Sequence, residues 1–154
     1  MPVQTAIHRR VNDARAGRDN SVIGRCASGW AVFGHQQFVE GYLLLLPDPV
    51  VPDLNALTPE RRSQFLLDMS RLGDALVRTM APVRVNYAIF GNVEPALHAH
   101  TIPRYRNEPE EMRTAHPWMY DWGKSPAYDP IAAGPLMRAL RTELAHLGAL
   151  RTPA

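Results

Sequence analysis

The chain has 154 residues, of which 45% are hydrophobic and 21% are charged. This length and composition are typical of one globular domain with its own core, so we expect a single domain over residues 1–154 and exclude a disordered chain. The sequence contains no apolar run long enough to cross a bilayer, and its first residues, MPVQTAIHRR, lack an apolar centre. We therefore expect neither a transmembrane helix nor a secretory signal.

Cysteine usage and charge narrow the function classes further. Cys26 is the single cysteine, which excludes an internal disulfide and a cysteine-based zinc site and favours the cytoplasm. The formal net charge is +2, and every basic residue except Lys124 is arginine, which suits a small anionic ligand or reflects genome base composition. Because there is no Lys/Arg tract, we expect no stable nucleic-acid complex, and we expect no membrane partner.

The first half of the chain carries signals for a short helix, several strands and one long helix. A helix is predicted near residues 7–16. Apolar and β-branched runs in the whole chain predict five strands, at residues 22–26, 30–33, 41–46, 83–90 and 97–102. Between the third and fourth strands, Thr58-Pro59-Glu60 is a helix start, and apolar residues at helical spacing predict an amphipathic helix over residues 58–80.

The second half ends in a loop and a helix. Residues 104–130 are polar and aromatic and are predicted to form a long ordered loop, and residues 135–147 a C-terminal helix. Strands that are grouped, and do not alternate strictly with helices, favour an α+β fold with an antiparallel sheet of about five strands.

The segment His98-Ala99-His100 is the one constellation with chemical content. Residues two apart on a strand point to the same face, so we expect the two imidazoles to lie side by side. Such a pair is unfavourable in a core, because burial and mutual repulsion both oppose protonation. The alternatives are a chance surface pair and a metal site with His116 or Glu94 as third ligand.

Four segments together resemble the histidine-triad (HIT) superfamily. They are GYLLLLP, the Thr-Pro-Glu-capped helix, VNYAIFGN and PALHAHTIPRY, and they span a motif-bearing core of about residues 20–106, followed by a C-terminal loop and helix at 107–150. The resemblance implies a HIT-like α+β domain and is strongest to dinucleoside polyphosphate (diadenosine tetraphosphate) hydrolases. It implies no metal and no cofactor.

The sequence departs from the family pattern at three places. Aligning the Ile-Pro-Arg ending puts Ala96, His98 and His100 at the three histidine positions, so alanine replaces the first histidine. Tyr42 stands where many members have histidine, and the usual ribose-binding aspartate falls near Gly34-His35, where neither residue is acidic.

The resemblance assigns roles to individual residues. His98 would be the nucleophile that forms a nucleotidyl-histidine, and His100 would bind and stabilise a phosphate oxygen. Asn92 would lie near the phosphates, with a turn residue as the alternative. The candidates for nucleoside binding, with ordinary packing as the alternative, are Phe33, His35, Gln37 and Asn86.

Two further features carry two interpretations each. Arg104 and Arg106 contact distal phosphates or are solvated surface residues. Trp118, Tyr120 and Trp122 form an aromatic wall for a base or pack the loop against the sheet. The chain as a whole is expected to be a nucleotide hydrolase or nucleotidyl transferase, with a non-catalytic nucleotide sensor, a metal site or an interaction module as alternatives. The resemblance also implies a homodimer that pairs through the 58–80 helix and the 83–90 strand.

Overall fold

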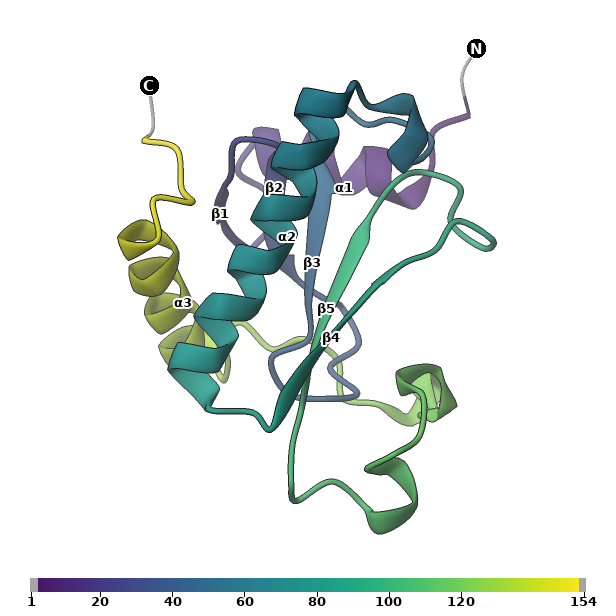
Figure 1. Cartoon of the computed structure of the whole chain (residues 1–154), viewed down its shortest axis with the longest axis vertical. Helices are drawn as coiled ribbons and strands as arrows, with labels where there is room; N and C mark the ends of the chain where they lie inside the picture. Colours follow the sequence, from purple (N-terminus) through teal and green to yellow (C-terminus); the bar gives the residue numbers. More distant parts are fainter. Residues whose placement is uncertain (1–2, 153–154) are drawn as a thin grey trace.

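The computed structural model describes residues 3–152 and forms a mixed α+β fold (Figure 1). Five antiparallel strands form one sheet in the order β1-β2-β3-β5-β4. The helices and strands are α1 (Ala6–Arg15), β1 (Val22–Arg25), β2 (Gly29–Phe33), β3 (Leu43–Pro47), α2 (Pro59–Met80), β4 (Arg84–Ile89), β5 (Ala99–Arg104) and α3 (Gly134–His146). The predicted fold class is confirmed.

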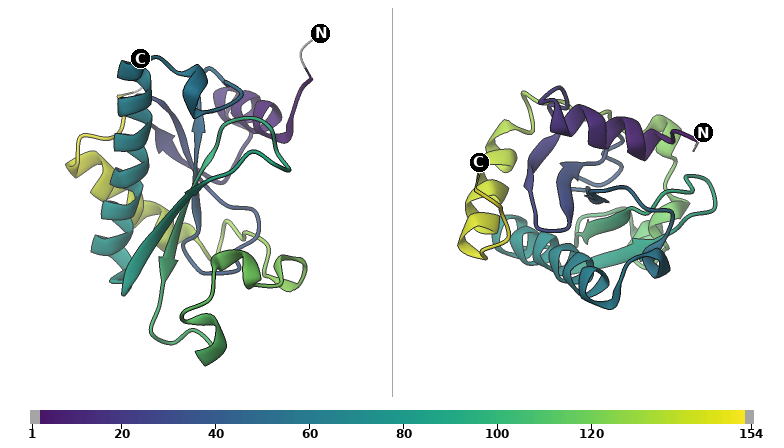
Figure 2. Two further views of the ribbon diagram at one scale, coloured as in Figure 1. Left: turned by 45° about the vertical axis from the view of Figure 1, so that its right-hand side comes forward. Right: turned by 90° about the horizontal axis from the view of Figure 1, so that it is seen from above.

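Two layers of helix enclose the sheet. Figure 2 shows α1 over one face and α2 with α3 over the other. Alternation along β3 explains this arrangement, because Leu43 and Leu45 join the core with α2 and α3, whereas Leu44 and Leu46 join the core with α1. A strand with both faces buried appears in sequence as a continuous apolar run.

The long helix α2 forms where its capping residues and apolar stripe predict it. The Thr58 hydroxyl accepts a hydrogen bond from the backbone N–H of Arg61, and Pro59 is the first helical residue. Phe65, Leu72 and Leu76 are fully buried against the sheet. Burying each such side chain stabilises the fold by about 2 kcal/mol.

Strand β5 runs two residues further than predicted and includes Pro103. The carbonyl of Arg104 accepts from Val83 on the β4 side, so the alternating ladder directs the Pro103 nitrogen to the other side. There, pairing with β3 has already ended at Thr101. The missing N–H of proline therefore breaks no ladder bond, and the strand continues.

The segment between β5 and α3 contains no strand of the sheet. Three short 3-10 helices divide it, at Glu110–Met112, Pro117–Met119 and Trp122–Lys124. None of the helices in residues 3–152 combines the length and the apolar character needed to span a membrane.

Candidate active site

His98 and His100 lie side by side where β5, an inner strand of the sheet, begins. Their ring centroids are 4.8 Å apart, and the planes are inclined by 71°. Both residues are buried, with 8% and 7% of their surface exposed. The ladder explains the placement, because β5 is paired on both sides and His100 lies opposite Leu44 and Ala88. The spacing of two residues thus puts both rings on the α1 face of the sheet.

The hydrogen bond of His98 defines which of its nitrogens is basic. His98 Nδ1 lies 2.8 Å from the backbone carbonyl oxygen of Ala96. Because a carbonyl only accepts, Nδ1 must carry the proton, and Nε2 of the neutral ring then holds the lone pair. A nitrogen lone pair of this kind is a nucleophile at neutral pH.

His100 makes its hydrogen bond to Tyr42. The Tyr42 hydroxyl lies 2.6 Å from His100 Nδ1, and the two rings stack with an inclination of 9°. Burial lowers the pKa of His100 to about 3, helped by the neighbouring His98, and burial raises the pKa of Tyr42. Both groups are therefore neutral at pH 7. An imidazole nitrogen accepts better than a phenol oxygen, so we assign Tyr42 as donor and His100 Nε2 as the protonated nitrogen.

A pocket of about 530 Å³ opens beside the two histidines. Its walls come from the end of β4, the turn that follows it and the segment after β5. The lining residues are Phe90, Asn92, Val93, Glu94, His98, His100, Trp118 and Trp122. The pocket is mostly apolar with few polar groups, which is typical of sites for small organic molecules.

Aromatic rings form the wall that faces His100. The Trp118 ring lies 4.9 Å from His100 and 4.8 Å from Phe90, in each case edge to face. Trp122 lies 5.5 Å from Trp118 and packs against Phe38 at 4.1 Å. Trp122 Nε1 is buried and has no hydrogen-bond partner within residues 3–152, so it is a free donor on a residue that lines the pocket.

Arg104 anchors the segment that carries Trp118, Tyr120 and Trp122 to the sheet. This buried side chain pairs with Glu108 at 3.0 Å and also donates to the carbonyls of Met112 and Ala115. The Tyr120 hydroxyl donates to Glu108 at 2.6 Å. The solvated interpretation of Arg104 was therefore wrong, because its guanidinium is buried, and the residue does not line the histidine pocket. Trp118 and Trp122 both form part of the pocket wall and pack their segment against neighbouring residues.

The structure brings Asn92 to the histidines but places the nucleoside-binding candidates elsewhere. Phe33 is core and stacks on Tyr128 at 5.1 Å. Gln37 Nε2 donates to the carbonyls of Gly34 and Tyr42, so it braces a turn. His35 is exposed, and Asn86 accepts from Arg104 in the wall of a separate cavity. These four residues do not line the histidine pocket.

Sequence reasoning did not predict that Phe90 lines the histidine pocket, and it considered Glu94 only as a metal ligand. The sequence signal that could have placed Phe90 in the pocket is its position directly before the Gly-Asn turn. Glu94 accepts from the backbone N–H groups of Ala6 and Ala96 and so ties the pocket rim to α1. His116 accepts from the Trp118 backbone N–H. Among the described residues, no third metal-ligating side chain joins the histidines in a cluster that could hold a metal ion.

The structure thus combines an antiparallel α+β fold with two adjacent histidines on an inner strand, at the edge of an aromatic pocket. The chain belongs to the HIT domain family, whose sequence profile matches residues 18–107. This family comprises nucleotide-binding proteins, hydrolases and transferases. No curated protein matches the chain.

Solved structures show the same fold. A histidine triad protein from Bradyrhizobium japonicum has a TM-score of 0.71 at 24% identity, over 84% of this chain and 94% of that one. One from Marinobacter aquaeolei VT8 has a TM-score of 0.71 at 22% identity, over 94% and 99%. A hypothetical histidine triad nucleotide-binding protein from Sulfolobus tokodaii has a TM-score of 0.63 at 14% identity, over 89% and 91%.

Proposed function

We propose that this protein is a nucleotide hydrolase or nucleotidyl transferase that cleaves its substrate at the α-phosphate, with His98 as nucleophile. The observation that carries the proposal is the hydrogen bond from His98 Nδ1 to the Ala96 carbonyl, which leaves Nε2 as the nucleophilic atom. Dinucleoside polyphosphates such as diadenosine tetraphosphate, or nucleoside phosphoramidates, are the proposed substrates.

In the first step, the lone pair of His98 Nε2 attacks the α-phosphorus. A P–N bond forms, and the bond from phosphorus to the leaving group breaks, with its electron pair going to the leaving group. The imidazole of the intermediate carries a positive charge. The Ala96 carbonyl, which already accepts from Nδ1, stabilises that charge without reorganisation.

In the second step, water attacks the same phosphorus from the side opposite the histidine. A P–O bond forms, the P–N bond breaks, and the electron pair returns to Nε2. The proton of the water passes to solvent, and a nucleoside monophosphate leaves. If another nucleophile replaces water, the same intermediate supports nucleotidyl transfer.

Neutral hydrogen-bond donors stabilise the phosphate in both steps. His100 carries a proton on Nε2, because Tyr42 occupies its Nδ1, and it therefore donates to a phosphate oxygen. Asn92 lines the same pocket and offers an amide donor. The aromatic wall of Phe90 and Trp118 excludes water around the phosphate, which strengthens each of these hydrogen bonds.

The defining experiment is turnover of a substrate panel in the presence of EDTA. Diadenosine tetraphosphate, diadenosine triphosphate and adenosine 5′-phosphoramidate are incubated with the wild type, and products are separated by chromatography. We expect nucleoside monophosphate from at least one substrate and its loss, by about a thousandfold or more, in His98→Ala. Base-quenched mass spectrometry should detect the nucleotidyl adduct on the wild type.

His146→Ala is the matched control, because His146 is an exposed histidine at the end of α3. It should retain wild-type turnover. Turnover that survives in His98→Ala, or that requires a metal ion, contradicts the proposed mechanism.

A nucleotide sensor is the second candidate, and the alanine at position 96 is the observation that favours it. If Ala96 replaces a histidine that takes part in catalysis, the protein retains nucleotide binding but loses turnover. AMP would then bind in the histidine pocket with no turnover of any substrate in the panel.

The homodimer through α2 and β4 and the cytoplasmic location stay predictions. The exposure of Val83, Tyr87 and Phe90 along the edge strand supports the homodimer.

A further inference from the structure

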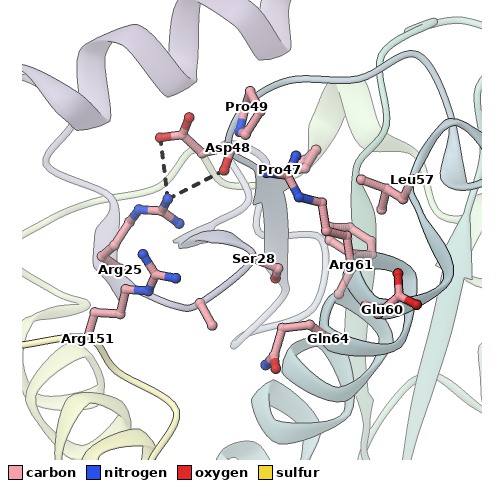
Figure 3. Close-up of a pocket in the computed structure, with 12 residues that line it drawn as sticks. Arg25, Ser28, Pro47, Asp48, Pro49, Leu57, Glu60, Arg61, Gln64 and Arg151 are labelled. Carbon is pink, nitrogen blue, oxygen red and sulfur yellow. Dashed lines mark hydrogen bonds and ion pairs between the residues drawn. The ribbon is translucent and has the colours of Figure 1, made fainter.

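A second cavity lies away from the histidines and has a different chemical character. It has a volume of about 410 Å³ and lies between the β1–β2 turn, the end of β3, the start of α2 and the segment that follows α3 (Figure 3). Among the described residues, none lines both this cavity and the histidine pocket. We refer to it as the arginine cavity, because Arg25, Arg61 and Arg151 line it.

Backbone pairing holds Arg151 next to Arg25. Leu150 forms a β-bridge with Cys26, and the Arg151 backbone N–H donates to the Arg25 carbonyl at 2.8 Å. The Leu150 side chain lies over Gly24, where a Cβ atom would approach it to 2.7 Å. The chain after α3 is therefore fixed along β1, and Figure 3 shows the two guanidinium groups adjacent on one wall of the cavity.

The two adjacent guanidinium groups repel each other. Burial lowers the pKa of Arg25, and the positive charge of Arg151 contributes in the same direction, against the attraction of Asp48. Two like charges held side by side by backbone pairing are stabilised when an anion lies between them. The side chain of Arg151 has no hydrogen-bond partner within residues 3–152, so its N–H groups are available for such an anion.

Arg61 supplies the opposite wall. It lies in the first turn of α2, where the helix dipole also favours negative charge. Figure 3 shows its side chain extending from α2 toward Pro47 across the cavity from Arg25 and Arg151. Like Arg151, it makes no side-chain hydrogen bond to any other described residue.

Asp48 partly neutralises Arg25, because one of its carboxylate oxygens lies 3.8 Å from Arg25 Nη2, whereas neither Arg61 nor Arg151 has an acidic partner among the described residues. The Asp48 carboxylate is bound by Arg15 and by Trp30 Nε1, and these hydrogen bonds oppose the effect of burial and hold its pKa below the usual value. Ser28 and Gln64 donate to the buried Asp68 carboxylate, which fixes the floor of the cavity. Glu60 is exposed on α2 and is the one lining carboxylate without such partners in the described chain.

We propose that the arginine cavity binds the phosphate group of a small phosphorylated molecule between Arg61 and the Arg25–Arg151 pair. A phosphate dianion offers three oxygens to guanidinium groups on two walls, whereas a carboxylate offers two oxygens and one charge. Leu57, Phe65 and Pro47 supply apolar surface for an organic part, and the volume suits a small metabolite. This binding site is independent of the chemistry proposed at His98.

Titration with inorganic phosphate at constant ionic strength, followed by ¹H–¹⁵N NMR, tests this site. We expect saturable shifts of the Ser28, Gln64 and Arg151 amides and of the arginine Nε–H signals. In Arg61→Gln/Arg151→Gln, the Kd for phosphate should rise about tenfold or more, since two charge-assisted hydrogen-bonding groups are lost. Glu60→Gln should lower it about twofold, since a repulsive charge is removed.

Arg138→Gln is the matched control, since it removes the same charge from an exposed arginine on α3. It should leave the Kd unchanged. The proposal is overturned if phosphate shifts only residues of the histidine pocket, if the double variant binds as the wild type does, or if Arg138→Gln weakens binding equally. Both substituted arginines are exposed, and the NMR spectrum itself verifies that the double variant is folded.

A second titration with ribose 5-phosphate distinguishes the source of the phosphate. Tighter binding than that of inorganic phosphate, with new shifts at Leu57 and Phe65, assigns the cavity to a phosphomonoester. Equal binding without those shifts assigns it to free phosphate, and the absence of binding by either probe overturns the proposal.

Discussion

Tyr42 and Gly34 form a matched pair beneath His100. Tyr42 hydrogen-bonds to His100 Nδ1, and a Cβ atom on residue 34 would lie 2.2 Å from the Tyr42 ring. Any side chain at position 34 would displace the ring, so the tyrosine requires the glycine. Two positions that depart from the family pattern in sequence are thus one structural unit, and that unit sets the tautomer of His100.

Tyr42→Phe tests the tautomer assignment. The substitution keeps the ring but removes the donor to His100 Nδ1, so the proton is no longer directed to Nε2. We expect kcat to fall about tenfold to a hundredfold while KM changes little, because the lost hydrogen bond acts mainly on the charge developed in the transition state. Tyr128→Phe is the control, since the Tyr128 hydroxyl donates to the Asn20 carbonyl. An equal effect of both substitutions argues against the assignment.

His100 also makes the stability of the fold depend on pH. Its folded pKa is lowered from 6.5 to about 3 by burial, so the unfolded chain takes up a proton in this range that the native chain does not accept. Stability is therefore complete above about pH 6.5 and declines as the pH falls toward 3. We expect His100 to account for about 2 kcal/mol of lost unfolding free energy between pH 7 and pH 5.

Urea unfolding of the wild type and His100→Asn at several pH values measures this effect. The slope of stability against pH between 7 and 5 should be smaller in His100→Asn, and His146→Asn should behave as the wild type does. The carboxyl groups with lowered pKa, at Asp19, Asp48 and Glu108, contribute equally in all three proteins. Identical slopes in the three proteins would rule out a neutral buried His100.

At the scale of elements, the segment between β5 and α3 owes its position to one buried ion pair. Arg104 is the last residue of β5, and Glu108 is four residues further on, so the pair connects the sheet to the segment directly. The carbonyls of Met112 and Ala115 and the hydroxyl of Tyr120 join the same network. Trp118 and Trp122 then reach the histidine pocket because the segment is held from its first turn onward.

Arg104→Gln should release this segment. The variant leaves Glu108 buried without its charge partner, so we expect the unfolding free energy to fall by about 2–4 kcal/mol. Urea unfolding measures the loss, and limited proteolysis should cut between residues 105 and 122 faster than in the wild type. Arg113→Gln is the control, because Arg113 is exposed on the same segment and lies 4.0 Å from the exposed Glu110. Resistance to proteolysis equal to that of the control counts against the ion pair as the anchor.

At the scale of the whole molecule, the sheet separates two ends with different chemistry. The histidine pocket lies where β5 begins, under the aromatic segment, and the arginine cavity lies at the β1–β2 turn against α2 and the chain after α3. The first joins residues 90–122, which are fairly close in sequence. The second joins residues 25, 61 and 151, which are close only in the folded chain.

The sequence by itself determined the features that depend on neighbours along the chain. The Thr58 cap and the apolar stripe specify α2, the apolar runs specify the strands, and the two-residue spacing specifies that His98 and His100 share a face. Hydrogen bonding and side-chain alternation within one element decide these features, and a period of 3.6 or 2 residues is visible in the sequence.

Only the tertiary structure decided which partners each polar group meets. The Tyr42–His100 bond spans 58 positions, and the exposed or buried state of Arg104 depends on a segment that returns over the sheet. Phe33 and Gln37 were predicted to bind the nucleoside. In the structure, Phe33 stacks on Tyr128 and Gln37 donates to turn carbonyls. Such contacts depend on the path of distant segments, and desolvation makes each buried polar group take whichever partner that path supplies.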